Sequence, residues 1–243
     1  GNLVLTPSLT DSGAPLTKLF ICAGEHACVL QGHRFPEASV SIVPLAADGR
    51  IDLAALAAML ADAQGERVLL ALQAANNETG VIQPVAEAAA LVHAAGGLVV
   101  CDAVQAAGRI DLRGLGADAL FMSAHKIGGP KGAGALAFAN IRLHISHALL
   151  RGGGQEKGLR AGTENIAAIA GFGAGARIAA ENREAEAMRL AALRVMNRPD
   201  EFELAALDFC VTYELSPPGW ERPRCRYQSL TPDVGGDAGH SIL

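Results

Sequence analysis

Residues 98–132 read LVVCDAVQAAGRIDLRGLGADALFMSAHKIGGPKG and contain two short apolar runs, each followed directly by polar side chains. Residues 98–101 and 119–122 have the length and composition of strands that are buried on both faces of a sheet. Asp102 follows the first run, and Lys126 lies shortly after the second. In open α/β sheets, ligands bind outside the carboxyl ends of the strands. The stretch therefore predicts a parallel sheet whose ligand-binding edge carries Asp102 and Lys126.

Further strands are indicated upstream by apolar runs at residues 19–22 and 40–43 and within 67–75. Helix signals separate them: Asp52 can cap an apolar-periodic segment, and Pro84 can open a helix that ends at a glycine pair. Strands that alternate with helices form βαβ units. We therefore expect the α/β class with a mostly parallel sheet.

The last third of the chain has a different pattern. From residue 166 to about 196 the sequence predicts one long helix, interrupted near 171–175 by closely spaced glycines. Beyond Asn197 prolines accumulate and periodicity is lost, apart from residues 202–211. We expect a loop-rich appendage or linker there.

The composition excludes several classes of protein. The 243 residues are 50% hydrophobic and 19% charged, which is typical of a core-forming globular chain and not of a disordered one. The net charge of −5 repels phosphate backbones, so nucleic acid is not an expected partner. No apolar run approaches the ~20 residues that span a bilayer, and no secretory leader is present, so we expect a cytoplasmic protein without a membrane anchor.

Five cysteines are present: Cys22, Cys28, Cys101, Cys210 and Cys225. They form no CxxC pair and lack zinc-ligand spacing, so neither a metal site nor a disulfide framework is expected. The first three are predicted to be reduced thiols in the core.

Polar residues follow four of the apolar runs. Each group alone is weak evidence for a functional site. An aspartate at a strand end is commonly a helix cap, a lysine there is commonly solvated, and a histidine there commonly has a structural role. Their convergence on one sheet edge is the stronger signal. The groups are Glu25-His26, Asn76-Asn77-Glu78, Asp102 with Gln105, and Ser123-Ala124-His125-Lys126.

Pyridoxal phosphate fits this combination of side chains. A partly desolvated lysine amine bonds to its aldehyde, and a carboxylate pairs with the pyridine nitrogen so that the ring can accept carbanion charge. An imidazole can stack on the ring, amides can bond the phenolic oxygen, and hydroxyl groups can hold the phosphate. The glycine-rich segment 128–134 lets the backbone turn tightly after Lys126.

Four segments of the chain resemble a known family. They are ANNETGVIQP at 75–84, CDAVQ at 101–105, SAHKIGGPKG at 123–132 and GGGQEKGLRAGTEN at 152–165. In order and spacing, residues 2–194 resemble cysteine desulfurases of the NifS/IscS type, which belong to the class V aminotransferases. The resemblance implies the three-layer α/β large domain of a pyridoxal-phosphate-dependent transferase.

The resemblance also implies roles for individual residues. Lys126 would hold the cofactor covalently, Asp102 would face the pyridine nitrogen, and His26 would stack on the ring and assist proton transfers. Asn77 and Gln105 would contact the phenolic oxygen. The phosphate would be bound by Ser123 and His125 and, in a homodimer, by Thr163 of the partner subunit.

The implied reaction converts L-cysteine to L-alanine and leaves the sulfur as a persulfide on an enzyme cysteine. The sulfur would then pass to an iron–sulfur scaffold or another acceptor protein, for iron–sulfur cluster or thio-cofactor synthesis.

The two ends of the chain depart from the family pattern. The family has a segment before residue 1, and its C-terminal small domain supplies the catalytic cysteine and a substrate-binding arginine. Residues 195–243 do not match that domain, and Cys210 and Cys225 lack the expected context. We therefore expect residues 1–194 to form a large domain that is incomplete at its N-terminus, followed by a divergent tail, so that the domain is truncated at both ends.

Three alternatives stay open. The chain could be an inactive fragment that lacks the catalytic-cysteine loop, or another class V enzyme such as an aminotransferase or selenocysteine lyase. Residues 171–176 also fit the G-x-G-x-x-A pattern of dinucleotide-binding proteins, but that motif should follow a strand, and here it lies within a predicted helix.

Overall fold

The computed structural model describes residues 1–139, 141–213 and 220. The chain divides into two compact units, Gly1–Arg183 and Glu184–Leu243, which are described separately. The boundary expected at residues 194/195 falls beside the last residue of helix α4 (Ile166–Val195). In the described part of the chain, no helix combines the length and apolarity needed to cross a membrane.

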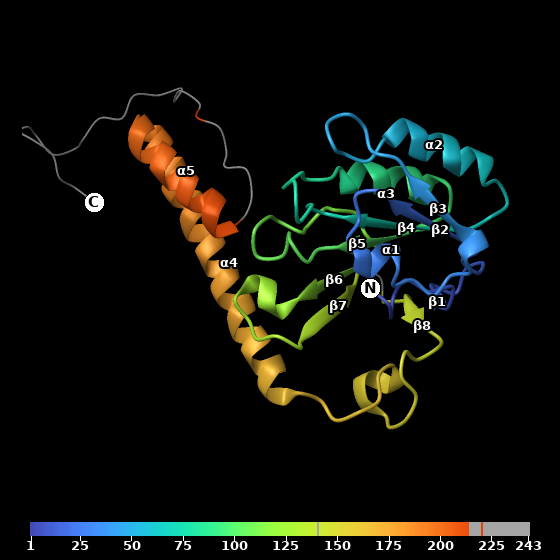
Figure 1. Cartoon of the computed structure of the whole chain (residues 1–243). Helices are drawn as coiled ribbons and strands as arrows, with labels where there is room; N and C mark the ends of the chain where they lie inside the picture. The colour runs from blue at the N-terminus through green and yellow to red at the C-terminus, as the bar shows by residue number, and fades with distance from the viewer. Residues whose placement is uncertain (140, 214–219, 221–243) are drawn as a thin grey trace, which may run out of the picture. The chain divides into compact units, whose positions relative to one another are not determined.

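A six-stranded sheet forms the centre of the first unit (Figure 1). Five strands are parallel, and the sixth, at one edge, runs antiparallel to its neighbour. The mostly parallel sheet and the α/β class are therefore confirmed. In spatial order the strands are β3 (Val40–Val43), β2 (Lys18–Cys22), β4 (Val68–Gln73), β5 (Leu98–Asp102), β6 (Ala119–Ser123) and β7 (Gly134–Phe138).

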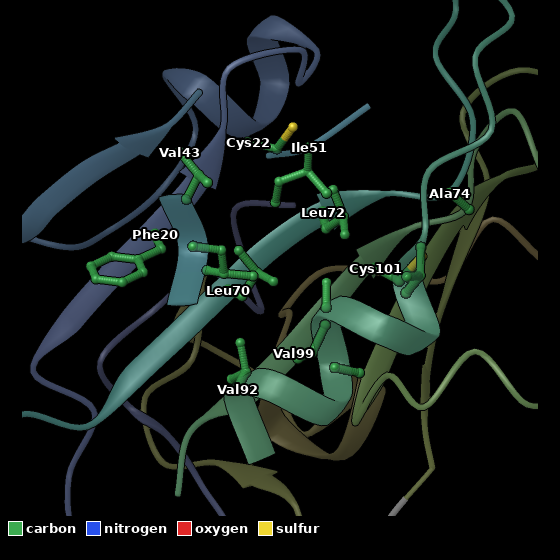
Figure 2. Close-up of a cluster of buried hydrophobic side chains, with 14 of the residues drawn as sticks. Phe20, Cys22, Val43, Ile51, Leu70, Leu72, Ala74, Val92, Val99 and Cys101 are labelled. Carbon is green, nitrogen blue, oxygen red and sulfur yellow. The ribbon is translucent and has the colours of Figure 1, made fainter. Parts of the chain in front are cut away.

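Helices α2 (Leu53–Asp62) and α3 (Val85–Ala94) cover one face of the sheet (Figure 1). Asp52 caps α2 as expected, since its Oδ1 accepts the N–H groups of Ala54 and Ala55, both at 2.9 Å. Apolar side chains of the strands and helices form one buried cluster on this face. Among those drawn in Figure 2 are Phe20, Val43, Leu70, Leu72, Val92, Val99 and Cys101.

The opposite face of the sheet is covered mainly by the N-terminal segment. This layer includes the short helices α1 (Ala27–Leu30) and η1 (Glu37–Ser39) and a two-stranded sheet of β1 (Leu9–Thr10) and β8 (His144–Ile145). Leu5, Leu9 and Val29 of this layer are fully buried against the sheet. The first unit thus has the three layers that the resemblance implied.

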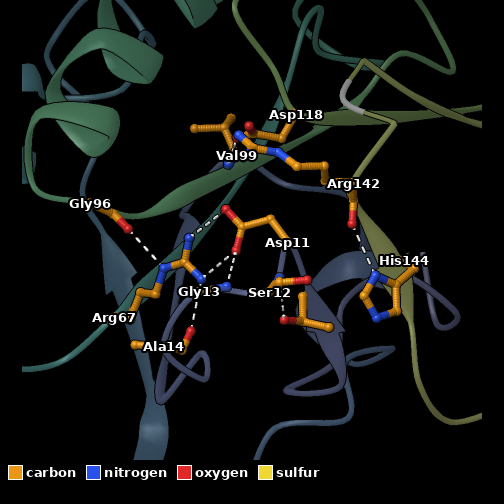
Figure 3. Close-up of polar contacts among 11 residues, drawn as sticks. Asp11, Ser12, Gly13, Ala14, Arg67, Gly96, Val99, Asp118, Arg142 and His144 are labelled. Carbon is orange, nitrogen blue, oxygen red and sulfur yellow. Dashed lines mark hydrogen bonds and ion pairs between the residues drawn. The ribbon is translucent and has the colours of Figure 1, made fainter.

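Arg67 fastens the N-terminal segment to the amino end of the sheet (Figure 3). Its guanidinium binds both carboxylate oxygens of Asp11 at 2.9 Å. It also donates to the carbonyl oxygens of Gly96 at 2.8 Å and Ala14 at 2.8 Å. The Arg67 hydrogen bonds hold the pKa of Asp11 well below its ordinary value.

Helix α4 runs without a break through the glycines at 171–175, so the expected interruption is wrong. A Cβ at Gly175 would lie 3.0 Å from the nitrogen of Gly129, and one at Gly171 would lie 3.0 Å from the ring of Pro130. These two glycines let the helix lie close against the loop that follows Lys126. The G-x-G-x-x-A pattern lies inside a helix and does not follow a strand, which does not fit a dinucleotide site.

The second unit contains the end of α4 and helix α5 (Pro199–Tyr213), so a loop-rich segment directly after Asn197 was a wrong expectation. Phe202 is 1% exposed and packs edge-on against Trp220, with ring centroids 5.2 Å apart. Leu190 and Leu193 complete this small core. The retained periodicity of residues 202–211 was the sequence signal for this helix.

Candidate active site

A cavity of about 270 Å³ opens at the carboxyl ends of the parallel strands. Seven of the eight predicted site residues line it, and they come from four separate strand ends. Its lining consists of His26, Cys28, Gln73, Ala75, Asn77, Asp102, Val104, Gln105, Ser123, His125 and Lys126. Thr163 is the exception: it is exposed and is not part of this lining.

Lys126 lies in a short 3-10 helix, η2 (Ala124–Ile127), directly after β6. Gly128 ends this helix with φ +81°, a left-handed conformation that favours glycine. The N–H of Gly129 then donates to the carbonyl of Ala124 at 2.9 Å. A Cβ at Gly129 would lie 2.9 Å from that same oxygen, so the tight turn that places Lys126 depends on glycine.

Ser123 and His125 flank the lysine and contact each other. Ser123 Oγ lies 2.8 Å from His125 Nδ1, and both side chains line the cavity. A hydroxyl and an imidazole held together in this way form a polar group that suits an anionic ligand such as a phosphate.

Asp102 is the last residue of β5 and is 7% exposed. Burial raises the pKa of its carboxyl, while the N–H of Val104, which donates to Oδ1 at 2.8 Å, acts in the opposite direction. A nearly buried carboxylate with a single backbone donor is stabilised by a cationic partner. The protonated ring nitrogen of a pyridoxal cofactor would be such a partner.

His26 caps the start of α1 through its side chain. Its Nδ1 accepts the N–H of Cys28 at 3.1 Å, which fixes the orientation of the ring. In the neutral imidazole the proton is then assigned to Nε2. The ring therefore presents Nε2 for contacts with a ligand.

Gln73 and Asn76 are positioning residues, of which Asn76 belongs to a polar group noted in the sequence and Gln73 was missed. The side-chain amides of both donate to the carbonyl oxygen of Gly24, Asn76 at 2.9 Å. They hold the loop that carries His26 above the end of β4. The sequence signal for Gln73 was a buried strand that ends in an amide instead of an apolar residue.

Asn76 and Asn77 have different tasks. The Oδ1 of Asn76 accepts the N–H groups of Glu78 and Thr79, both at 2.9 Å, and so shapes the turn. Asn77 is exposed and lines the cavity. Only Asn77 is therefore placed to contact a ligand.

Gln105 reaches the cavity from the turn after β5. Its Oε1 is buried and has no hydrogen-bond partner among the described residues. A buried amide oxygen of this kind is costly unless a ligand or water satisfies the group.

The expectation that Cys28 is a core thiol is wrong. Cys22 and Cys101 are fully buried, and burial raises the pKa of Cys22 to about 11 and that of Cys101 further. Cys28 is exposed and lines the cavity, although partial burial and the charge of Asp102 raise its pKa too. Cys210 and Cys225 lie outside the described side chains.

The cavity residues fit a pyridoxal cofactor. A lysine amine, a buried carboxylate, an oriented imidazole and an unpaired amide oxygen meet in one small space. Lys126 could hold the aldehyde carbon, Asp102 the ring nitrogen and Ser123 with His125 the phosphate.

The aminotransferase class-V family model matches residues 5–220 of the chain. The cysteine desulfurase IscS of Anaeromyxobacter sp. (strain Fw109-5) is 40% identical over 181 residues, which cover 72% of this chain and 44% of that protein. The cysteine desulfurase of Cereibacter sphaeroides is 44% identical over 162 residues, 64% of this chain and 40% of that protein. The chain thus spans less than half the length of these curated relatives.

Solved structures with the same fold include that of a NifS-like protein from Rickettsia africae ESF-5. The TM-score is 0.65 at 32% sequence identity, with 77% of this chain and 52% of that chain covered. A second NifS-like protein gives a TM-score of 0.61 at 34% identity and covers 73% of this chain and 50% of that one.

Proposed function

Because the chain belongs to the class V aminotransferase family, whose enzymes depend on pyridoxal phosphate, we propose that it acts as part of a cysteine desulfurase. The reaction is the conversion of L-cysteine to L-alanine with transfer of the sulfur to an enzyme cysteine. The observation that carries the proposal is the single cavity lined by Lys126, Asp102 and His26.

When bound, the cofactor would supply a cationic ring that can stabilise negative charge at the substrate Cα. Asp102 at the end of β5 would hold the ring nitrogen, because a carboxylate next to a base favours the protonated form of that base. Lys126 provides the amine that holds the cofactor, and the turn at Gly128 fixes where that amine lies.

His26 is proposed to move protons between the substrate and the site. Cys28 donates its N–H to Nδ1, so the ring cannot turn freely, and Nε2 stays available. An imidazole is the side chain whose ordinary pKa suits both giving and taking a proton near neutral pH.

Asn77 and Gln105 are proposed to bond the phenolic oxygen, and Ser123 and His125 the phosphate. We propose a homodimer in which Thr163 of the partner subunit completes the phosphate site. In support, Thr163 is exposed and does not line the cavity of its own chain.

The transfer of sulfur requires a reactive cysteine and an acceptor. Of the three cysteines whose side chains are described, only Cys28 lines the cavity. We propose that the persulfide cysteine belongs to the part of the relatives that this chain does not span. An iron–sulfur scaffold or another sulfur acceptor would then take the sulfur. The buried, unpaired thiols of Cys22 and Cys101 support a reducing compartment such as the cytoplasm.

The test combines binding and turnover. Purified protein with pyridoxal phosphate should show the visible absorption of a lysine imine, and borohydride should fix the cofactor on the peptide that contains Lys126. The matched control is Lys131→Ala, which removes a nearby exposed lysine that lies outside the cavity. Lys126→Ala should abolish the adduct and Lys131→Ala should not; an adduct on any other lysine contradicts the proposal.

Alanine and sulfide are then measured with L-cysteine as substrate. Formation of both supports the desulfurase. Binding without turnover identifies a chain that retains the cofactor site but needs a separate sulfur-accepting cysteine. Release of a keto acid or selenide from the corresponding substrates identifies an aminotransferase or a selenocysteine lyase.

A further inference from the structure

Glu25 is a buried carboxyl that the proposed chemistry does not use. It is 5% exposed, and its Oε2 accepts the N–H of His26 at 3.3 Å. Its Oε1 is buried without a hydrogen-bond partner, and no cation among the described residues pairs with it. An ionised carboxylate in such surroundings is an uncompensated buried charge, which is strongly unfavourable.

Asp102 is the second buried carboxyl of this region. Gln73 lies directly opposite Asp102 in the β4–β5 register, and its side chain donates to the carbonyl of Gly24, the residue before Glu25. The two carboxyls thus belong to adjacent parts of one layer, and the charge of Asp102 disfavours ionisation of Glu25. Repulsion between two buried carboxylates favours a state in which one of the two carboxyls keeps its proton.

The hydrogen bonds indicate which of the two holds the proton. Asp102 accepts a 2.8 Å bond from the N–H of Val104 and faces the positive charge of the Gly1 amine. Glu25, in contrast, accepts a longer bond, 3.3 Å, from the N–H of His26 and has a backbone interaction with Gln73. The anionic form is therefore better stabilised on Asp102. In agreement, burial, followed by the charge of Asp102, raises the pKa of Glu25 to about 8.

The other ionisable groups near the two carboxyls are three thiols, the His26 imidazole and the amino group of Gly1, whose positive charge acts to lower the pKa of Asp102. Burial raises the pKa of Cys22 to about 11, and burial also raises the pKa values of Cys28 and Cys101. These thiols stay neutral near pH 7. The charge of the region is therefore set by Glu25, Asp102, His26 and the amino group of Gly1.

We propose that Glu25 is a positioning residue that holds the proton of a carboxyl pair with Asp102, so that the pair has one negative charge and Asp102 presents it to the ring nitrogen. This inference rests on the proposed cofactor site. It assigns to Glu25 a role in setting the charge state of Asp102, without contact with substrate.

The first test detects the proton directly in the full chain without cofactor. The infrared difference spectrum of the wild type minus Glu25→Gln should contain the carbonyl stretch of a protonated carboxyl near pH 6.5, and this band should disappear with a midpoint near 8. The matched control Glu37→Gln removes an exposed glutamate and should give no such band. Absence of the band in the Glu25 difference overturns the proposal.

The second test asks whether Asp102 is the partner. In an Asp102→Asn background the midpoint of the Glu25 band should fall, because the repelling charge is gone. An unchanged midpoint overturns the pairing. Should this variant not fold, the shift of the Glu25 midpoint on cofactor binding tests the pairing, and urea unfolding of the wild type and Glu25→Gln tests independently whether Glu25 holds the proton.

In the unfolding experiment the sign follows from the raised pKa. The folded wild type binds a proton that the unfolded chain has released, at every pH between the ordinary 4.5 and about 8. Its folding constant should therefore fall about tenfold per pH unit in this range, relative to that of Glu25→Gln. Parallel curves for the two proteins contradict a proton on Glu25.

The third test adds pyridoxal phosphate and separates the two proposals. A cationic ring beside Asp102 should lower the midpoint of the Glu25 band, because it relieves the repulsion between the carboxyls. If pyridoxal phosphate binds and the midpoint of the Glu25 band does not shift, the carboxyl pair does not act on the cofactor ring, and the proposal is overturned. No binding, with the band and its Asp102 dependence intact, contradicts the proposed function and leaves the carboxyl pair standing.

Discussion

Gln73 and Asp102 occupy directly opposite positions at the carboxyl ends of β4 and β5. Gln73 directs its side-chain amide to the carbonyl of Gly24, while Asp102 lines the cavity. One strand pair therefore fixes both the buried anion and the loop that carries His26. The relative placement of the carboxylate and the imidazole follows from the sheet and does not depend on a contact between them.

Glycine spacing in α4 gives a prediction about stability. A Cβ at Gly175 would lie 3.0 Å from Gly129 N and 3.1 Å from Ile127 O, whereas one at Gly173 would meet nothing within 4 Å. Both changes to alanine gain the same helix propensity, but only Gly175→Ala adds overpacking. Gly173→Ala should therefore be the more stable variant, by about 1–3 kcal/mol in urea unfolding. Equal stability of the two variants would show that α4 does not pack against the loop after Lys126.

Asp102→Asn should weaken cofactor binding. The amide keeps the shape of the side chain but removes the charge that pairs with the ring nitrogen. A charge-assisted hydrogen bond contributes about 2 kcal/mol, so the dissociation constant should rise about 30-fold. Absorbance titration with pyridoxal phosphate measures it, and Asp62→Asn, at the exposed end of α2, is the control. An unchanged affinity for Asp102→Asn would remove the carboxylate from the cofactor contacts.

Cys28 should be the cavity thiol that an alkylating reagent modifies. It is exposed, whereas Cys22 and Cys101 are fully buried and should stay unmodified in the folded protein. Because its pKa is raised, labelling should accelerate as the pH rises from neutral to about 9. Pyridoxal phosphate should slow the labelling several-fold, since both occupy one cavity. Peptide mass spectrometry identifies the alkylated cysteine. If pyridoxal phosphate leaves the labelling rate unchanged, Cys28 lies outside the part of the cavity that the cofactor occupies.

The Asp11–Arg67 pair should contribute to stability in a pH-dependent way. Asp11→Ala removes two hydrogen bonds to a largely buried guanidinium and should lower the free energy of unfolding by about 2 kcal/mol near neutral pH. The folded-state pKa of Asp11 lies below its unfolded value, so this contribution is complete above about pH 4 and is lost as the pH falls further. Urea unfolding between neutral and acidic pH tests this. A difference between the proteins that persists undiminished in acid would exclude the ion pair as its source.

Five of the six strands of the main sheet were predictable because each is a short, mostly apolar run, whereas β7 (Gly134–Phe138) was not predicted. Leu70 and Val99 are completely buried, and a strand buried on both faces has no other pattern. The cap at Asp52 was predictable for a similar reason, since it depends on atoms two and three residues away. The helix at 199–213 was missed because the prolines that flank it indicated a loop, while its packing partner Leu190 lies on another helix.

By itself the sequence determined the α/β class and which side chains end the strands, because both depend on local patterns and on the common direction of parallel strands. Only the tertiary structure decided the surroundings of those side chains. It buried both Glu25 and Asp102, turned Cys28 towards the cavity and placed the Gln73 amide where it binds the carbonyl of Gly24. Burial and electrostatic coupling arise between residues that lie far apart in the chain, so no local pattern encodes them.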